Sequence, residues 1–194
     1  DVPVFGHVPM VLGSDKARLS KRHGAMSVTA YREMGYYPDA LLNYLVRLGW
    51  SYGDQEFFTR EELVEKFTLD NVGRSAGVFN PEKLLALNAE HIRHAPEDKL
   101  APHLLPFLRE RGIEAEEGPF LHGVIATLKP RSKTFIEMAD GAVFYFRAPE
   151  AYEEKGVKKF FKPESADTVR RMTAALEGAA AFDEKSLEAV FKQV

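Results

Sequence analysis

Helix start signals recur along most of this sequence, and they limit the fold more than any other feature. Thr59 and Glu62 have the spacing of a capping box, in which each side chain accepts a hydrogen bond from the other residue's backbone N–H. Asn80 followed by Pro81 is a second start, because asparagine caps a helix and proline suits its first turn. We therefore expect a mainly α-helical protein.

The remaining helices are predicted from the same signals together with apolar residues at helical spacing. The predicted helices span residues 27–34, 38–48, 59–67, 80–92, 100–112, 120–128, 164–176 and 183–191. Thr134 and Glu137 repeat the capping-box spacing, and the short apolar run 142–146 fits either a strand or a helix. In the helix 38–48 the expected apolar face consists of Leu41, Leu42, Leu45, Val46 and Leu48.

Two segments near the start lack this pattern. Residues 2–12 mix apolar residues with proline and glycine, which predicts a short extended segment that ends at Gly13. Residues 14–25 show almost no apolar periodicity, and we expect an exposed basic loop there. The polar stretch 95–99 predicts a junction between a mixed first half and an all-helical second half.

Composition narrows the class of protein. With 194 residues, 45% of them hydrophobic, the chain should form one ordinary globular domain or two small ones. The absence of cysteine rules out disulfides and cysteine-ligated zinc and suggests a cytoplasmic location. No apolar run approaches the roughly 20 residues of a membrane span, so we expect no membrane partner. A chain that begins with Asp1 suggests a fragment or a processed product.

Positive charge is clustered although the net charge is −3. The clusters comprise Lys16, Arg18, Lys21 and Arg22; then Lys129, Arg131 and Lys133; and finally Lys158, Lys159 and Lys162. One such cluster is usually a solvated surface, but three favour a polyanion contacted at separate points. The six histidines show no metal-ligand spacing, and no metal site is predicted.

Residues 18–24, RLSKRHG, resemble the second signature loop of class I aminoacyl-tRNA synthetases, which is written KMSKS in that family. Such a loop brings an ammonium group and backbone N–H groups to the triphosphate of ATP. The resemblance implies that the following residues bind ATP: Arg18, Leu19, Ser20, Lys21 and Arg22. It also implies that Lys21 is catalytic and that Mg²⁺ arrives with ATP, without protein ligands identified in this chain.

A longer stretch resembles the glutamyl branch of that class. The matching segments are YYPDALLN at 36–43, YLVRLGW at 44–50 and VFNPEKL at 78–84, and beyond residue 100 the similarity thins to scattered positions. The resemblance implies that residues 1–24 end the catalytic domain, that 25–95 form a stem-contact α/β region, and that 96–194 form an incomplete helical anticodon-binding domain. It also implies tRNA contacts at Arg131, with Lys129 and Lys133 as alternatives, because Arg131 follows Pro130 directly before a helix start.

The activity implied by this resemblance is ligation of glutamate to tRNA(Glu) through glutamyl-adenylate, with ATP, glutamate and tRNA as partners and a monomeric protein. The HIGH-like motif and the glutamate pocket of the family do not occur in the sequence, so the chain alone should be inactive. Three alternatives stay open: the glutaminyl branch, which the helical second half disfavours; a stand-alone tRNA-binding module; and a helical protein-interaction scaffold. The sequence does not decide whether the glutamine tRNA is also charged.

Overall fold

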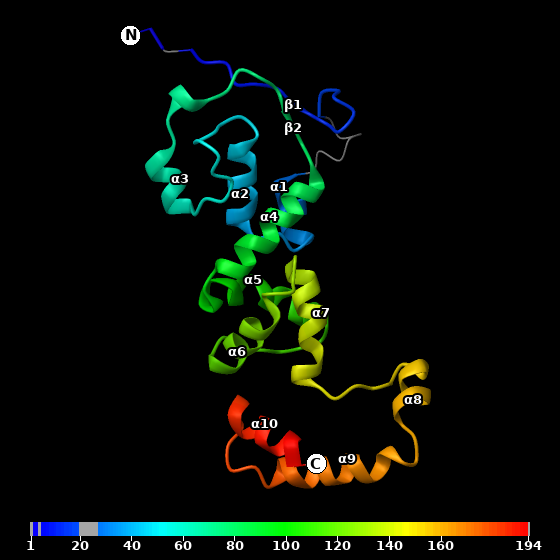
Figure 1. Cartoon of the computed structure of the whole chain (residues 1–194). Coiled ribbons are helices and arrows are strands. Elements are labelled where there is room, and N and C mark those ends of the chain that lie inside the picture. Colours follow the sequence, from blue (N-terminus) through cyan, green and yellow to red (C-terminus); the bar gives the residue numbers. More distant parts are fainter. Residues whose placement is uncertain (1, 4, 20–26, 194) are drawn as a thin grey trace. The chain divides into compact units, whose positions relative to one another are not determined.

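The computed structural model describes residues 2–3, 5–19 and 27–193, and it divides into two compact units, 1–147 and 148–194. Ten helices and a two-stranded sheet occur in the described ranges (Figure 1), which confirms the expected mainly α-helical fold. The first unit contains β1 (Val11–Leu12), α1 (Val28–Glu33), α2 (Pro38–Arg47), α3 (Arg60–Lys66), the 3₁₀ turn η2 (Leu69–Asn71), β2 (Gly77–Val78), α4 (Pro81–His94), α5 (Glu97–Glu110), α6 (Pro119–Leu128) and α7 (Phe135–Phe146). The second unit contains α8 (Glu154–Phe160), α9 (Ser165–Glu177) and α10 (Glu184–Gln193).

The predicted helix starts are confirmed where the signal is local. Thr59 Oγ1 accepts a hydrogen bond from Glu62 N at 3.2 Å, and Thr59 N donates to the Glu62 side chain at 2.9 Å. Asn80 Oδ1 accepts from the next two free backbone N–H groups, those of Glu82 and Lys83. The second capping box is only half formed, because Thr134 caps α7 but the Glu137 carboxylate accepts from Lys133 N at 2.7 Å instead of Thr134 N.

Other elements differ from the prediction. The run 142–146 is helical and belongs to α7, while α8 and β2 were not predicted. Among the described residues of 2–12, β1 is the only strand, and it pairs in parallel with β2 in the register Val11 to Gly77 and Leu12 to Val78. Most of the predicted apolar face of α2 is confirmed, since Leu41 is buried and Leu42, Val46 and Leu48 pack against the core clusters. Leu45 is an exception at 44% exposed, and the polar Asn43 is fully buried although it was not predicted to be.

Three apolar clusters form the core of the first unit. The largest combines α5, α6 and α7 with Tyr37, Ala40 and Ile92 from the preceding elements. The second lies around Tyr31, Tyr44 and Phe79 and the third around Trp50, Phe58 and Leu63. Because the largest core includes residues from both sides of the predicted junction, the compact unit does not end at residue 95. None of the described side chains in the second unit is buried.

Candidate nucleic-acid interface

The described part of the basic loop is a tight turn fixed on β1. Gly13 N donates to Ala17 O at 2.9 Å, and Leu19 N donates to Val11 O at 2.9 Å, so the chain folds back antiparallel to β1. Arg18 is exposed beside the strand, whereas Leu19 is half-buried and packs against the second core cluster. Leu19 therefore anchors the loop. Ser20, Lys21 and Arg22 lie outside the described residues.

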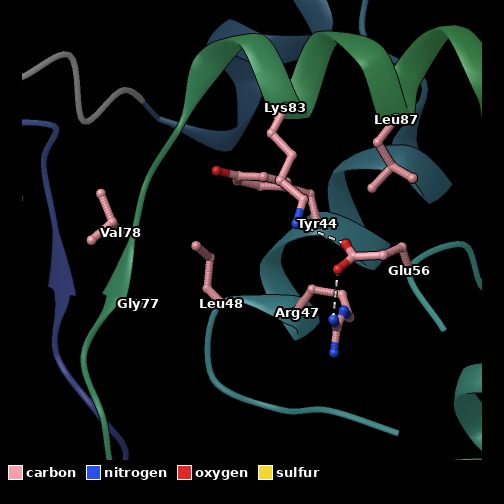
Figure 2. A pocket seen from close by; sticks show the side chains of 8 residues that line it. All are labelled: Tyr44, Arg47, Leu48, Glu56, Gly77, Val78, Lys83 and Leu87. Carbon is pink, nitrogen blue, oxygen red and sulfur yellow. Dashed lines mark hydrogen bonds and ion pairs between the residues drawn. The ribbon is translucent and has the colours of Figure 1, made fainter. Parts of the chain in front are cut away.

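Gly77 and Val78 of β2, the strand that pairs with β1, line a pocket with charged walls (Figure 2). In β2 a Cβ on Gly77 would lie 2.1 Å from Leu48 O, so only glycine allows this strand to approach the end of α2 so closely. In Figure 2 the Glu56 carboxylate lies between Lys83, at 2.8 Å, and Arg47, at 2.9 Å. The hydrogen bond from Lys83, supported by Arg47, lowers the pKa of Glu56. Glu56 thus engages both cations of the pocket, and the three groups together carry a net charge of +1.

The predicted tRNA-binding cations between α6 and α7 are not equivalent in the structure. Lys129 Nζ donates to Ala95 O at 3.0 Å and pairs with Glu97 at 2.8 Å, so this side chain links the end of α6 to the connection between α4 and α5. Arg131 and Lys133 are exposed, and neither side chain has a hydrogen bond or an ion pair with another described residue. The structure therefore leaves Arg131 and Lys133 available to an external anion or base.

The turn that carries these two cations is held from beneath by Ser132, which is only 6% exposed. Its hydroxyl donates to Leu128 O at 2.9 Å, and its backbone N–H donates to the same carbonyl at 3.1 Å. The side chains on either side of Ser132 face solvent. This alternation of exposed, buried and exposed residues presents both cations from one short, hydrogen-bonded turn.

A buried polar network connects α2, α4 and the segment before α3, and it was not predicted from the sequence. Asn43 Oδ1 accepts from Phe58 N and lies 2.9 Å from His91 Nε2, and Asn43 Nδ2 donates to Glu56 O. Since Asn43 Oδ1 is an acceptor, the His91 Nε2 carries the proton. Burial lowers the pKa of His91 to about 4, so the ring is neutral at ordinary pH. The N–H of His91 Nε2 is used by its hydrogen bond to Asn43, so we interpret His91 as a structural residue.

The described part of the chain contains no group of three or more His, Cys, Asp or Glu side chains that could hold a metal ion. None of the described helices is both long and apolar enough to cross a membrane.

Comparisons with known protein families define the class. Residues 1–86 match the model described as tRNA synthetases class I (E and Q), catalytic domain, and residues 99–194 match the model described as anticodon binding domain. The first match ends at residue 86 and the second begins at residue 99. The two matches describe a class I synthetase segment of the E and Q type, followed by an anticodon-binding segment.

The individual proteins that resemble the chain include two bacterial glutamate-tRNA ligases and one solved structure of such a ligase. The glutamate-tRNA ligase of Geotalea uraniireducens is 56% identical over 193 residues, and that of Geobacter sulfurreducens is 54% identical over 192 residues. The solved structure of a glutamate tRNA ligase from Elizabethkingia meningosepticum, in complex with its amino acid, has a TM-score of 0.80 at 26% identity and covers all of this chain. The chain is similar to these glutamate-tRNA ligases along its whole length, and it spans 41% of each of the two ligases and 42% of the solved chain.

Proposed function

We propose that this chain is the part of a glutamate-tRNA ligase that supplies the ATP-closing loop and a tRNA-binding surface. The observation that carries the proposal is the 56% identity to the Geotalea uraniireducens glutamate-tRNA ligase across 100% of the chain. The complete enzyme would use ATP to form glutamyl-adenylate and would then transfer glutamate to tRNA(Glu). We further propose that it acts as a monomer in the cytoplasm.

In this proposal Lys21 is the catalytic ammonium, and Arg18, Leu19, Ser20 and Arg22 complete the ATP-binding loop. A cation there stabilises the negative charge that builds on the phosphates in the transition state. The hydrogen bond from Leu19 N to Val11 O and the packing of Leu19 support a loop with a fixed base. Mg²⁺ would be brought by ATP and held by its phosphate oxygens.

The proposed RNA contact is the turn between α6 and α7 with Arg131 and Lys133. Both cations are exposed on a backbone that Ser132 holds, so they can meet RNA with little loss of main-chain entropy. A guanidinium can pair with base edges or stack on an unpaired base, which suits Arg131 to a single-stranded anticodon. Lys133 suits a phosphate, and Lys129 has the weakest case because Glu97 and Ala95 occupy it.

A charging assay tests this proposal in a chimeric ligase, in which the chain replaces the matching region of the Geotalea uraniireducens enzyme. Arg131→Gln should cost about 1–3 kcal/mol in kcat/KM for the cognate tRNA and relax discrimination at one anticodon position. Arg109→Gln is the matched control. It removes the same charge from an exposed position of α5 that is twelve residues, or about 18 Å of helix, beyond Glu97, the partner of Lys129.

The outcomes separate the possible roles. An equal loss with all anticodon variants would make Arg131 a phosphate contact, and an unchanged kcat/KM would remove it from the interface. Transfer of glutamate by the isolated chain would contradict the proposal that the chain supplies only part of the enzyme. Tight tRNA binding by the isolated chain, with a chimera that charges nothing, would favour the stand-alone binding module.

A further inference from the structure

Asn88, on α4, joins two distant parts of the first unit through one buried side chain. Its Oδ1 accepts a hydrogen bond from Tyr37 N at 2.8 Å, and its Nδ2 donates to Lys133 O at 2.6 Å. Tyr37 is the N-cap residue of α2, and Lys133 belongs to the turn with the two exposed cations. The Asn88 side chain is fully buried, and both of its polar ends are used.

A second hydrogen bond lies next to this bridge. Phe135 N, at the start of α7, donates to Gly35 O at 2.9 Å. The backbone is thus held on both sides of Thr134, through the Lys133 carbonyl by Asn88 and through the Phe135 N–H by Gly35. The partners on the other side of this junction come from the stretch between α1 and α2 and from α4, which lie in the part of the chain that matches the catalytic domain or immediately after it.

We propose that Asn88 is a positioning residue for RNA recognition. By holding the Lys133 carbonyl, it sets the direction in which the turn presents Arg131 and Lys133. The inference rests on the proposed function, because it assumes that this turn contacts the anticodon. Removing the amide would leave the Lys133 carbonyl and the Tyr37 N–H without a partner in a buried place, and the peptide after Lys133 would have to rotate to recover one.

Asn43 offers a matched control in the same unit. It is also a fully buried asparagine with both ends of its amide engaged, and its loss would likewise leave buried groups unpaired. Its partners are Glu56, Phe58 and His91, and none of them belongs to the turn between α6 and α7. A purely structural role for Asn88 would give both substitutions the same phenotype.

The experiment introduces Asn88→Ala, Asn43→Ala, Arg131→Gln and the double variant N88A/R131Q into the chimeric ligase. The measured quantity is kcat/KM for the cognate tRNA divided by kcat/KM for a tRNA with one anticodon substitution. This ratio does not depend on the fraction of folded enzyme, so loss of stability alone leaves it unchanged. Asn88→Asp serves as a second variant, because its carboxylate keeps an acceptor for Tyr37 N but has no donor for Lys133 O.

We expect Asn88→Ala and Asn88→Asp to reduce the ratio by about tenfold, the lower end of the range for a lost base contact, while Asn43→Ala leaves it unchanged. The double variant should discriminate no worse than Arg131→Gln, since both changes remove one interaction. Suppose that Arg131→Gln lowers the ratio. An unchanged ratio in both Asn88 variants, or an equal reduction in Asn43→Ala, would then overturn the positioning role of Asn88 and leave the proposed function standing. An unchanged ratio in Arg131→Gln would overturn anticodon reading by this turn, and the inference with it.

Discussion

Gly35 allows the α1–α2 turn to pack against the first residues of α7, so Gly35→Ala should destabilise the first unit by two mechanisms. Gly35 has a φ of +78°, a left-handed conformation that costs an alanine about 1–2 kcal/mol. A Cβ at this position would lie 2.8 Å from Ile136 N and 3.0 Å from Phe135 N. Both atoms are backbone atoms, which cannot move aside as the end of a flexible side chain can.

The second mechanism acts through the hydrogen bond from Phe135 N to Gly35 O. If the new methyl group pushes α7 away, this bond is lost, with a net cost of about 0.5–1.5 kcal/mol. Alanine also restricts the unfolded chain, which stabilises the folded state by about 0.4–1 kcal/mol. The expected loss is therefore about 2 kcal/mol in the free energy of unfolding, and it is larger if α7 cannot shift.

Comparison with Gly112→Ala separates the steric part of this loss from the backbone strain. Gly112 also has a positive φ, +68°, but nothing lies within 4 Å of the position that its Cβ would occupy. It should therefore lose only about 1 kcal/mol, from backbone strain less the unfolded-state gain.

Urea unfolding followed by the fluorescence of Trp50 measures both variants. Trp50 is the single tryptophan of the chain and is buried in the first unit, so its signal reports that unit. A difference between the two variants smaller than about 0.5 kcal/mol, the usual scatter between independent sites, would refute the close contact between Gly35 and α7.

Two further predictions concern chemistry and pH. Lys21→Ala in the chimeric ligase should slow adenylate formation by about 10²–10³ in single-turnover kinetics, whereas Lys16→Ala, outside the RLSKRHG segment, should not. A rate for Lys21→Ala within about twofold of the parent would contradict its role as the loop ammonium. Burial in the folded chain lowers the pKa of His91 to about 4, below the ordinary histidine value of about 6.5, so the unfolded state takes up the proton first as pH falls. The stability should be complete above about pH 6.5 and should decline toward about pH 4, by at most about 3 kcal/mol, and His91→Gln should flatten this decline in urea titrations.

The features that were predictable from the sequence are those whose partners are close along the chain. The Thr59 and Glu62 capping box and the Asn80 cap each connect residues within three positions, so local spacing contains the whole signal. The run 142–146 is too short for periodicity to decide, and its continuation with Phe135 as α7 resolves it. The pairing of β1 with β2 joins residues 66 positions apart in the chain, Val11 and Gly77, and no local rule predicts it.

Two positions on α2, Leu45 and Asn43, show where apolar spacing alone is not sufficient. Asn43 is buried because Phe58 N, Glu56 O and His91 surround its amide and satisfy both of its ends, which offsets the cost of burying a polar group. Leu45 is exposed at the surface instead, beside Pro9 and Gly49. Only the fold brings these partners together, since Asn43 and His91 are 48 residues apart.

The same limit applies to the candidate RNA interface, where the sequence favoured Arg131 and left Lys129 and Lys133 as alternatives. What separates Lys129 from the other two is Glu97, an acid on another helix, 2.8 Å from its ammonium group. What orients the turn is Asn88, 45 residues earlier in the chain. The core that Tyr37, Ala40 and Ile92 share with α5, α6 and α7 has the same consequence. The surface proposed to read the anticodon is thus held by residues from the part of the chain that precedes it, and a substitution there can change RNA recognition without touching RNA.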